Sequence, residues 1–109
     1  MLTVKEKAIN TTCENYEAIK TLLEEAKKEL ELAEIDHDHA GWYMNELENS
    51  YAIYEDYATE QKLDKACIDF NKSLKAYNAS MEKCERLEEM LNTLKDIETE
   101  LYFINDIEE

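Results

Sequence analysis

The sequence predicts an all-α fold, either an antiparallel helical hairpin or a three-helix bundle with coiled-coil-like packing. The chain of 109 residues has no proline and one glycine, Gly41, whereas an all-β fold of this length needs many turn residues. Apolar residues make up 44% of the chain and recur at alternating spacings of three and four, as in helices that pack along one stripe. The length fits a single helical domain spanning residues 1–109.

The first predicted helix covers about residues 3–36. Thr3 followed by Glu6 forms a capping-box pattern at its start. A helix of this length is roughly 50 Å long, which favours pairing with an antiparallel neighbour. Its heptad stripe consists of Ile9, Thr12, Tyr16, Ile19, Leu23, Ala26, Leu30 and Ala33.

A turn is predicted over about residues 37–45. Gly41 can adopt the left-handed conformation that ends a helix, and Asn45 followed by Glu48 can start the next one. The next stripe is aromatic where the first was aliphatic: Met44, Leu47, Tyr51, Tyr54 and Ala58.

The second and third predicted helices cover about residues 46–77 and 80–106. A break near residue 78 would give three helices of similar length. A break at residues 59–61, or no second break at all, are the alternatives. The acidic end, residues 106–109, opposes the helix dipole and is expected to fray. The stripe continues through Ala66, Phe70, Leu74, Tyr77, Met81, Cys84, Leu87, Leu91, Leu94, Ile97, Leu101 and Ile104.

The formal net charge of −15 excludes some partners. Residues 36–60 contribute −7 and residues 99–109 contribute −4, while residues 61–98 are nearly balanced. Phosphate contacts need clustered lysine and arginine, so direct binding of nucleic acid is not expected. The same argument disfavours an anionic membrane surface.

The interval between Lys28 and Lys62 contains ten carboxylates and no basic residue. It also contains Trp42 and four tyrosines. Acidic residues attract basic proteins, and large aromatic side chains supply rigid contact area. The interval therefore predicts a partner-binding surface formed by Trp42, Tyr43, Glu46, Glu48, Ile53, Glu55, Asp56, Tyr57 and Glu60.

Catalytic and metal-binding patterns are weak. The run from Asp36 to His39 alternates aspartate with histidine, but histidines two residues apart on a helix point in different directions. Glu34 and His37 form a single Glu-x-x-His pair, where a di-iron bundle needs two. We therefore predict no catalytic residue, no metal site and no cofactor, so the chain is not expected to be an enzyme.

Cellular location is inferred from three features. The apolar start is interrupted by Lys5, so no signal peptide is expected. No apolar run is long enough to span a membrane. The three cysteines lack the pairing of a disulfide framework or a metal site. A cytoplasmic protein is expected, in the cytoplasm of a host cell if a phage encodes it.

These features predict a small acidic module that inhibits or antagonises a nucleic-acid-binding protein or nuclease by occupying its basic surface. In composition the chain resembles phage-encoded antagonists of host defence or transcription. DNA mimicry is the more specific form: a helix over residues 38–60 would carry six carboxylates, against roughly twenty phosphates on duplex DNA of that length. The alternative is a homo-oligomeric coiled coil that acts as a structural, scaffold or adaptor protein. A homodimer is one form that it can take.

Overall fold

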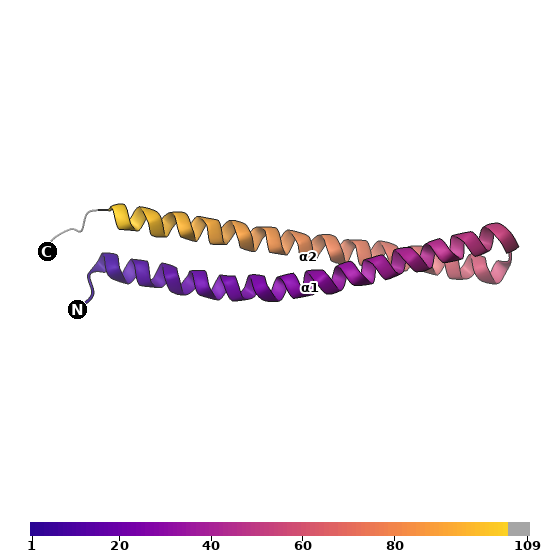
Figure 1. Cartoon of the computed structure of the whole chain (residues 1–109), viewed down its shortest axis with the longest axis horizontal. Coiled ribbons are helices and arrows are strands. Elements are labelled where there is room, and N and C mark those ends of the chain that lie inside the picture. The colour runs from indigo at the N-terminus through magenta and orange to yellow at the C-terminus, as the bar shows by residue number, and fades with distance from the viewer. Residues whose placement is uncertain (105–109) are drawn as a thin grey trace. The chain divides into compact units, whose positions relative to one another are not determined.

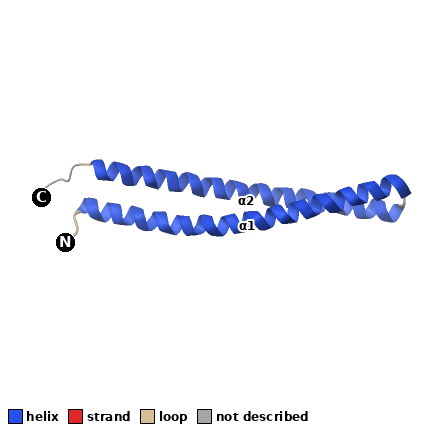
Figure 2. Ribbon diagram, in the orientation of Figure 1, coloured by secondary structure: helices blue, strands red, loops and turns tan. Residues whose placement is uncertain are grey.

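The protein is an all-helical hairpin, seen here in a computed structural model that describes residues 1–104. Helix α1 spans Val4–Tyr54 and helix α2 spans Tyr57–Phe103. The described residues contain no strand and no third helix (Figures 1 and 2). The all-α prediction is confirmed in its hairpin form, and the three-helix alternative is not supported.

The turn predicted over residues 37–45 is wrong, because α1 runs through it without interruption. The half-buried positions Ala33, His37, Ala40, Met44 and Leu47 keep the spacing of three and four across the segment, so its contact face never changes direction. Glycine in a helix costs about 1 kcal/mol relative to alanine, and packing against α2 offsets this cost.

The break predicted near residue 78 is also wrong, because α2 is continuous there. Tyr77, Ser80 and Cys84 keep the heptad spacing, while Asn78 and Ala79 are exposed. The reversal occurs at Glu55 and Asp56 instead, a few residues before the alternative break at residues 59–61. Helix α2 ends at Phe103. The predicted fraying of residues 106–109 lies outside the described residues.

Contacts at the chain ends secure both helices. The backbone N–H of Glu6 donates to Thr3 Oγ1 at 3.0 Å, which confirms the predicted N-terminal cap of α1. The Nζ atom of Lys5 donates to the carbonyl oxygens of Tyr102 at 3.3 Å and Ile104 at 2.6 Å. A lysine thereby satisfies backbone carbonyls at the C-terminal end of α2, which has no basic residue in its last turn.

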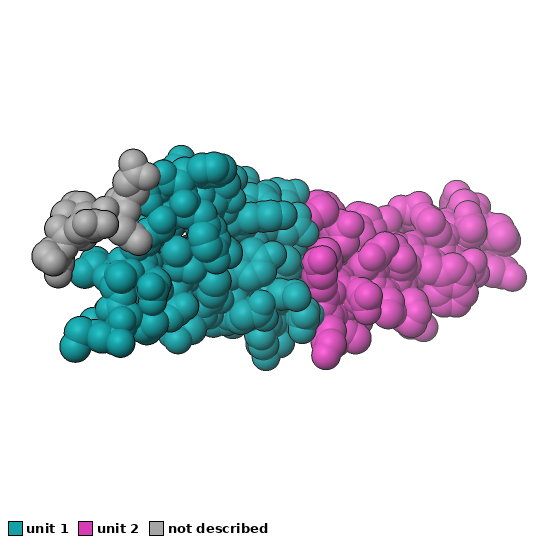
Figure 3. Space-filling model, turned by 60° about the vertical axis from the view of Figure 1, so that its left-hand side comes forward, with its two compact units in different colours: residues 1–26, 83–109 teal, residues 27–82 magenta. Residues whose placement is uncertain are grey.

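The described chain divides into two compact units (Figure 3). Unit 1 consists of Met1–Ala26 with Lys83–Glu109, and unit 2 consists of Lys27–Glu82. Within each unit, a segment of α1 runs antiparallel beside a segment of α2 (Figure 1).

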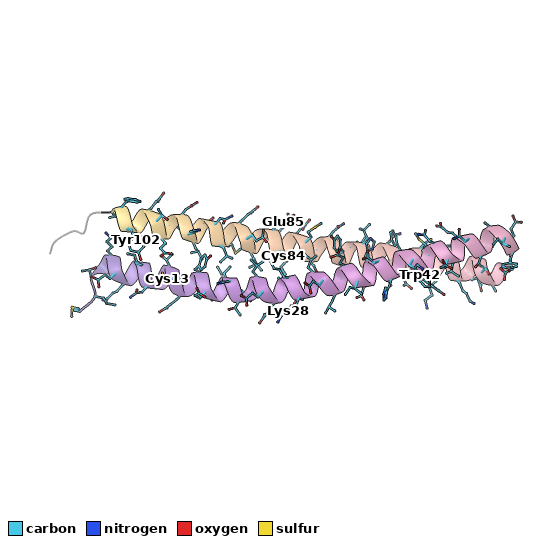
Figure 4. The ribbon with its side chains drawn as sticks, in the orientation of Figure 1. Cys13, Lys28, Trp42, Cys84, Glu85 and Tyr102 are labelled. Carbon is cyan, nitrogen blue, oxygen red and sulfur yellow. The ribbon has the colours of Figure 1, made fainter. Side chains whose placement is uncertain are left out.

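Unit 1 contains most of the buried side chains. Leu23 and Ala26 from α1 are buried with Cys84, Leu87 and Leu91 from α2. Figure 4 shows Cys84 between the two helices, while Glu85 beside it points away. These residues all belong to the predicted stripes, so the predicted core of unit 1 is largely confirmed.

Unit 2 has a more polar seam, and here the predicted stripe of α2 departs from the structure. Ala66 is its one buried apolar side chain. Half-buried Ser73 and Ser80 occupy seam positions, whereas Leu74 and Met81, predicted as core, are 37% and 36% exposed. The heptad spacing from Ala66 and Phe70 leads to residue 73 and not to residue 74, so the predicted stripe is out of phase there.

Candidate functional site

The helix reversal is built by two adjacent acidic residues. Glu55 has a φ of 46°, and its backbone N–H donates to the carbonyl of Tyr51 at 2.7 Å. This is the αL motif that ends many helices, formed here without glycine. Asp56 precedes the first residue of α2, and its carbonyl accepts the N–H of Glu60 at 3.1 Å. Both carboxylates therefore lie at a defined turn between two helix ends.

Exposed apolar side chains flank this turn. Ile53, Tyr54 and Tyr57 are each 73% exposed. Tyr54 was predicted as a core residue, and this is wrong, because α1 ends there and its side chain is exposed. We call residues 53–60 the hairpin tip. Five of the nine predicted partner-binding residues belong to the tip: Ile53, Glu55, Asp56, Tyr57 and Glu60.

The other four predicted residues lie earlier on α1 and do not join the tip. Trp42 is 66% exposed and Tyr43 is 48% exposed (Figure 4). Trp42 precedes Ile53 by eleven residues, about 16 Å along a helix. Glu46 lies one turn after Trp42, whereas exposed Glu48 points to another side of the helix. The nine residues therefore form a compact tip and a scattered group on α1.

Outside the tip, lysines offset part of the negative charge of unit 2. The α2 segment of this unit carries Lys62, Lys65, Lys72 and Lys75. Within the tip, by contrast, three exposed carboxylates lie among exposed apolar side chains and there is no basic residue. The tip is thus the part of unit 2 where acidic and aromatic groups are most closely combined.

His37 forms a polar cluster that the sequence analysis missed. Its Nδ1 lies 3.0 Å from Ser73 Oγ, and its ring lies against Phe70 and Tyr77, with centroid separations of 4.6 and 6.0 Å. The unbroken heptad spacing from Ala33 through His37 to Ala40 could have placed His37 in the seam. The alternation of aspartate and histidine suggested a polar turn instead.

The hydrogen bonds of this cluster run in the wrong direction to activate a nucleophile. The Ser73 hydroxyl donates to the Phe70 carbonyl at 2.7 Å, so its oxygen accepts the proton on His37 Nδ1. A general base must instead accept the serine proton. The cluster therefore serves the packing of α1 against α2.

A surface groove of about 440 Å³ lies next to this cluster in unit 2. Ala33 and Ala76, which have small side chains, are among the residues that line it. Glu29, Asp36 and Lys72 also line it, together with Leu32 and Ser73. These charges are of both signs, so the groove has no clear preference for an anion or a cation.

The histidines do not meet in space. His37 lies in the seam and His39 is exposed, as expected for residues two apart on a helix. Among residues 1–104, no group of three or more His, Cys, Asp or Glu side chains is arranged to hold a metal ion.

The cysteines are separate free thiols. Cys13 is half-buried on α1, and the carboxylate of Glu98 on α2 acts on its thiol. Burial raises the pKa of the Cys13 thiol, and the negative charges of Glu98 and Glu17 raise it further. A thiol with a raised pKa is a poor nucleophile near neutral pH.

Comparison with known protein families, with curated proteins and with solved structures finds no match. Neither helix of the described chain has a stretch both long and apolar enough to cross a membrane. The candidate site therefore depends on the geometry and charge of the hairpin alone.

Proposed function

We propose that this protein is a small acidic interaction module that inhibits or antagonises a nucleic-acid-binding protein or nuclease by occupying its basic surface. The observation that carries the proposal is the hairpin tip, where Ile53, Tyr54 and Tyr57 are each 73% exposed beside three exposed carboxylates. Exposed aromatic side chains of this size commonly mark contact surfaces.

The chemistry of the tip suits arginine and lysine. Carboxylates accept charge-assisted hydrogen bonds from guanidinium groups, and tyrosine rings attract cations over their faces. The backbone hydrogen bonds of Glu55 and Glu60 hold the turn in place. A preorganised turn loses little conformational entropy when it binds.

Docking of the tip onto a basic groove requires a less continuous negative charge than full DNA mimicry does. A duplex backbone carries negative charge without interruption, whereas α2 places Lys62, Lys65, Lys72 and Lys75 in the same unit as the acidic segment. Contact between the tip and a basic groove is therefore the form of the hypothesis that we favour.

The test is affinity capture followed by binding to the purified partner. We expect a variant with Glu55→Lys, Asp56→Lys and Glu60→Lys to lose binding, because three attractions become repulsions. The matched control carries Glu85→Lys, Glu88→Lys and Glu89→Lys, an equal change of charge on exposed residues of unit 1. Loss of binding by both variants would point to net charge alone, and retention by the folded tip variant would contradict the proposal.

Salt dependence gives a second readout. Binding through exposed charges should weaken as added salt screens them, because the Debye length falls from about 10 Å at 0.1 M to about 3 Å at 1 M. Binding that does not respond to salt would contradict an electrostatic tip.

The alternative function is a homo-oligomeric scaffold or adaptor. The heptad run of residues 3–35 suggested it, but buried Leu23 and Ala26 of that run lie in the seam between α1 and α2 of the same chain. Self-association therefore needs a face other than this seam.

A further inference from the structure

Two tyrosines lie among the carboxylates of the hairpin tip. Carboxylates alone attract lysine and arginine alike, so they set the sign of the partner's charge and no more. Tyr54 and Tyr57 are each 73% exposed. The face of a tyrosine ring attracts any cation, but a planar guanidinium also stacks on the ring, which a compact ammonium group cannot do. The tyrosines therefore add a preference that the acidic residues lack.

The helix reversal keeps these rings next to the carboxylates. Helix α1 ends at Tyr54 and helix α2 begins at Tyr57, with Glu55 and Asp56 between them. The α-carbons of the two tyrosines therefore lie within about 11 Å of each other. Backbone hydrogen bonds hold the turn on both sides. A cation drawn to either of the two acidic residues thus arrives beside an aromatic side chain.

The carboxylates of the tip also favour a guanidinium. Glu55, Asp56 and Glu60 are exposed, and within residues 1–104 no hydrogen bond or ion pair involves their side chains. An approaching cation therefore displaces only water from them. A guanidinium donates two parallel N–H···O bonds to one carboxylate, whereas an ammonium group acts as a point charge.

The apolar side chain of Ile53 gives a third reason. It is 73% exposed, so a partner that covers the tip removes water from the neighbouring ion pairs. A guanidinium is more weakly hydrated than an ammonium group, and it loses less when it leaves water. The rings, the paired carboxylate oxygens and the apolar neighbour thus all favour the same basic group.

We propose that the hairpin tip recognises arginine in preference to lysine, and that its partner presents an arginine-rich surface. The inference rests on the proposed function and adds which basic side chain the tip binds. It fits a partner that binds nucleic acid, because arginine is well suited to bidentate contacts with phosphate groups. The tip then competes with phosphate for the same guanidinium groups.

Two peptides of equal charge test this preference. One is a decapeptide of arginine and the other a decapeptide of lysine, each with the same fluorescent label. Fluorescence anisotropy at about 0.15 M salt measures the Kd of each peptide for the full chain. We expect the arginine peptide to bind at least about fivefold more tightly. Equal Kd values, tighter binding of the lysine peptide, or no binding of either peptide up to about 1 mM would overturn the inference.

The variant Tyr54→Leu with Tyr57→Leu removes both rings and keeps the side chains apolar. It should lose most of the preference, because the arginine peptide loses its stacking partners. The matched control is Tyr102→Leu with Phe103→Leu, which removes two aromatic rings of unit 1 that are 60% and 82% exposed. This control should keep the preference. Circular dichroism should show equal helicity in all three proteins, because every changed side chain is exposed. A tip variant that prefers arginine as strongly as wild type would count against the inference.

The lysine variant of the tip separates this inference from the proposed function. Glu55→Lys with Asp56→Lys and Glu60→Lys should weaken the binding of both peptides, because both depend on the negative charge of the tip. If wild type binds the two peptides equally and this variant weakens both, the acidic tip remains the binding surface and only the preference for arginine is wrong. If this variant binds both peptides as tightly as wild type, the proposed function itself is contradicted.

Discussion

The Nδ1 atom of His37 on α1 lies 3.0 Å from the hydroxyl oxygen of Ser73 on α2. This bond lies in the seam of unit 2, where Phe70 and Tyr77 contact the imidazole ring. A polar pair in the seam between two helices can fix their alignment. Sliding α2 by one heptad so that Ala66 takes the place of Ser73 would leave a half-buried imidazole without its partner.

Replacing Ser73 with alanine should lower the free energy of unfolding. The change leaves His37 Nδ1 without its hydrogen bond, which costs about 1 kcal/mol. The control is Ser80→Ala, at the same heptad position one repeat later and equally half-buried. Urea unfolding should show the larger loss for Ser73→Ala, and equal effects would mean that the His37 contact contributes nothing to stability.

Gly41 serves packing and not a turn. A β-carbon at this position would lie 3.3 Å from Phe70 Cε2 and 3.8 Å from Cδ2, so the glycine lets the Phe70 ring approach the α1 backbone. The φ of Gly41 is not in the left-handed region. Its position in mid-helix therefore has a steric cause.

Gly41→Ala should raise the free energy of unfolding by up to about 1 kcal/mol, because alanine favours helix over glycine by that amount. Part of the gain is lost in moving the Phe70 ring, so the gain should be larger in a Phe70→Leu background. Chemical denaturation of the two single variants and the double variant measures this coupling. A loss of stability in both backgrounds would instead favour the turn that the sequence predicts at this glycine.

The structure shows which parts of the hairpin were predictable. The N-terminal cap at Thr3 and the buried positions Leu23 and Ala26 follow from residue type and spacing. The heptad rule failed in α2 where serine and glutamate occupy seam positions, as at Ser73 and Glu98. Apolar neighbours such as Leu74 were assigned to the stripe in place of these residues, because a pattern read from one sequence favours the more hydrophobic of two adjacent residues.

The reversal at residues 55 and 56 had no sequence signal. Glycine and asparagine usually fill the left-handed position that ends a helix, and here a glutamate fills it. The predicted partner-binding residues were chosen for composition, so the sequence could not reveal that five of them gather at the tip. That grouping depends on where the chain reverses.

Glu55→Gly should stabilise the hairpin. The left-handed conformation costs a non-glycine residue about 1–2 kcal/mol, and glycine adopts it without that penalty. The control is Asp56→Gly, because among the described non-glycine residues only Glu55 has a positive φ. Thermal unfolding should show a higher midpoint for Glu55→Gly than for the wild-type protein, and no such increase for Asp56→Gly. A lower midpoint for Glu55→Gly would place the reversal elsewhere.

Glu98→Gln should make Cys13 more reactive. Burial and then the Glu98 carboxylate raise the pKa of the thiol, so the thiolate is scarce near pH 8. Removing the negative charge lowers that pKa toward its ordinary value, and the alkylating species is the thiolate. The rate of modification of Cys13 by iodoacetamide at pH 8, followed by peptide mass spectrometry, should rise about threefold or more.

Glu100→Gln is the matched control, because it removes one carboxylate from an exposed position two residues further along α2. It should leave the rate at Cys13 unchanged, and the two variants should converge at high pH, where the thiol is fully ionised in both. A rate that rises equally in both variants would assign the shift to net charge. A rate unchanged in Glu98→Gln would mean that burial alone holds the Cys13 proton.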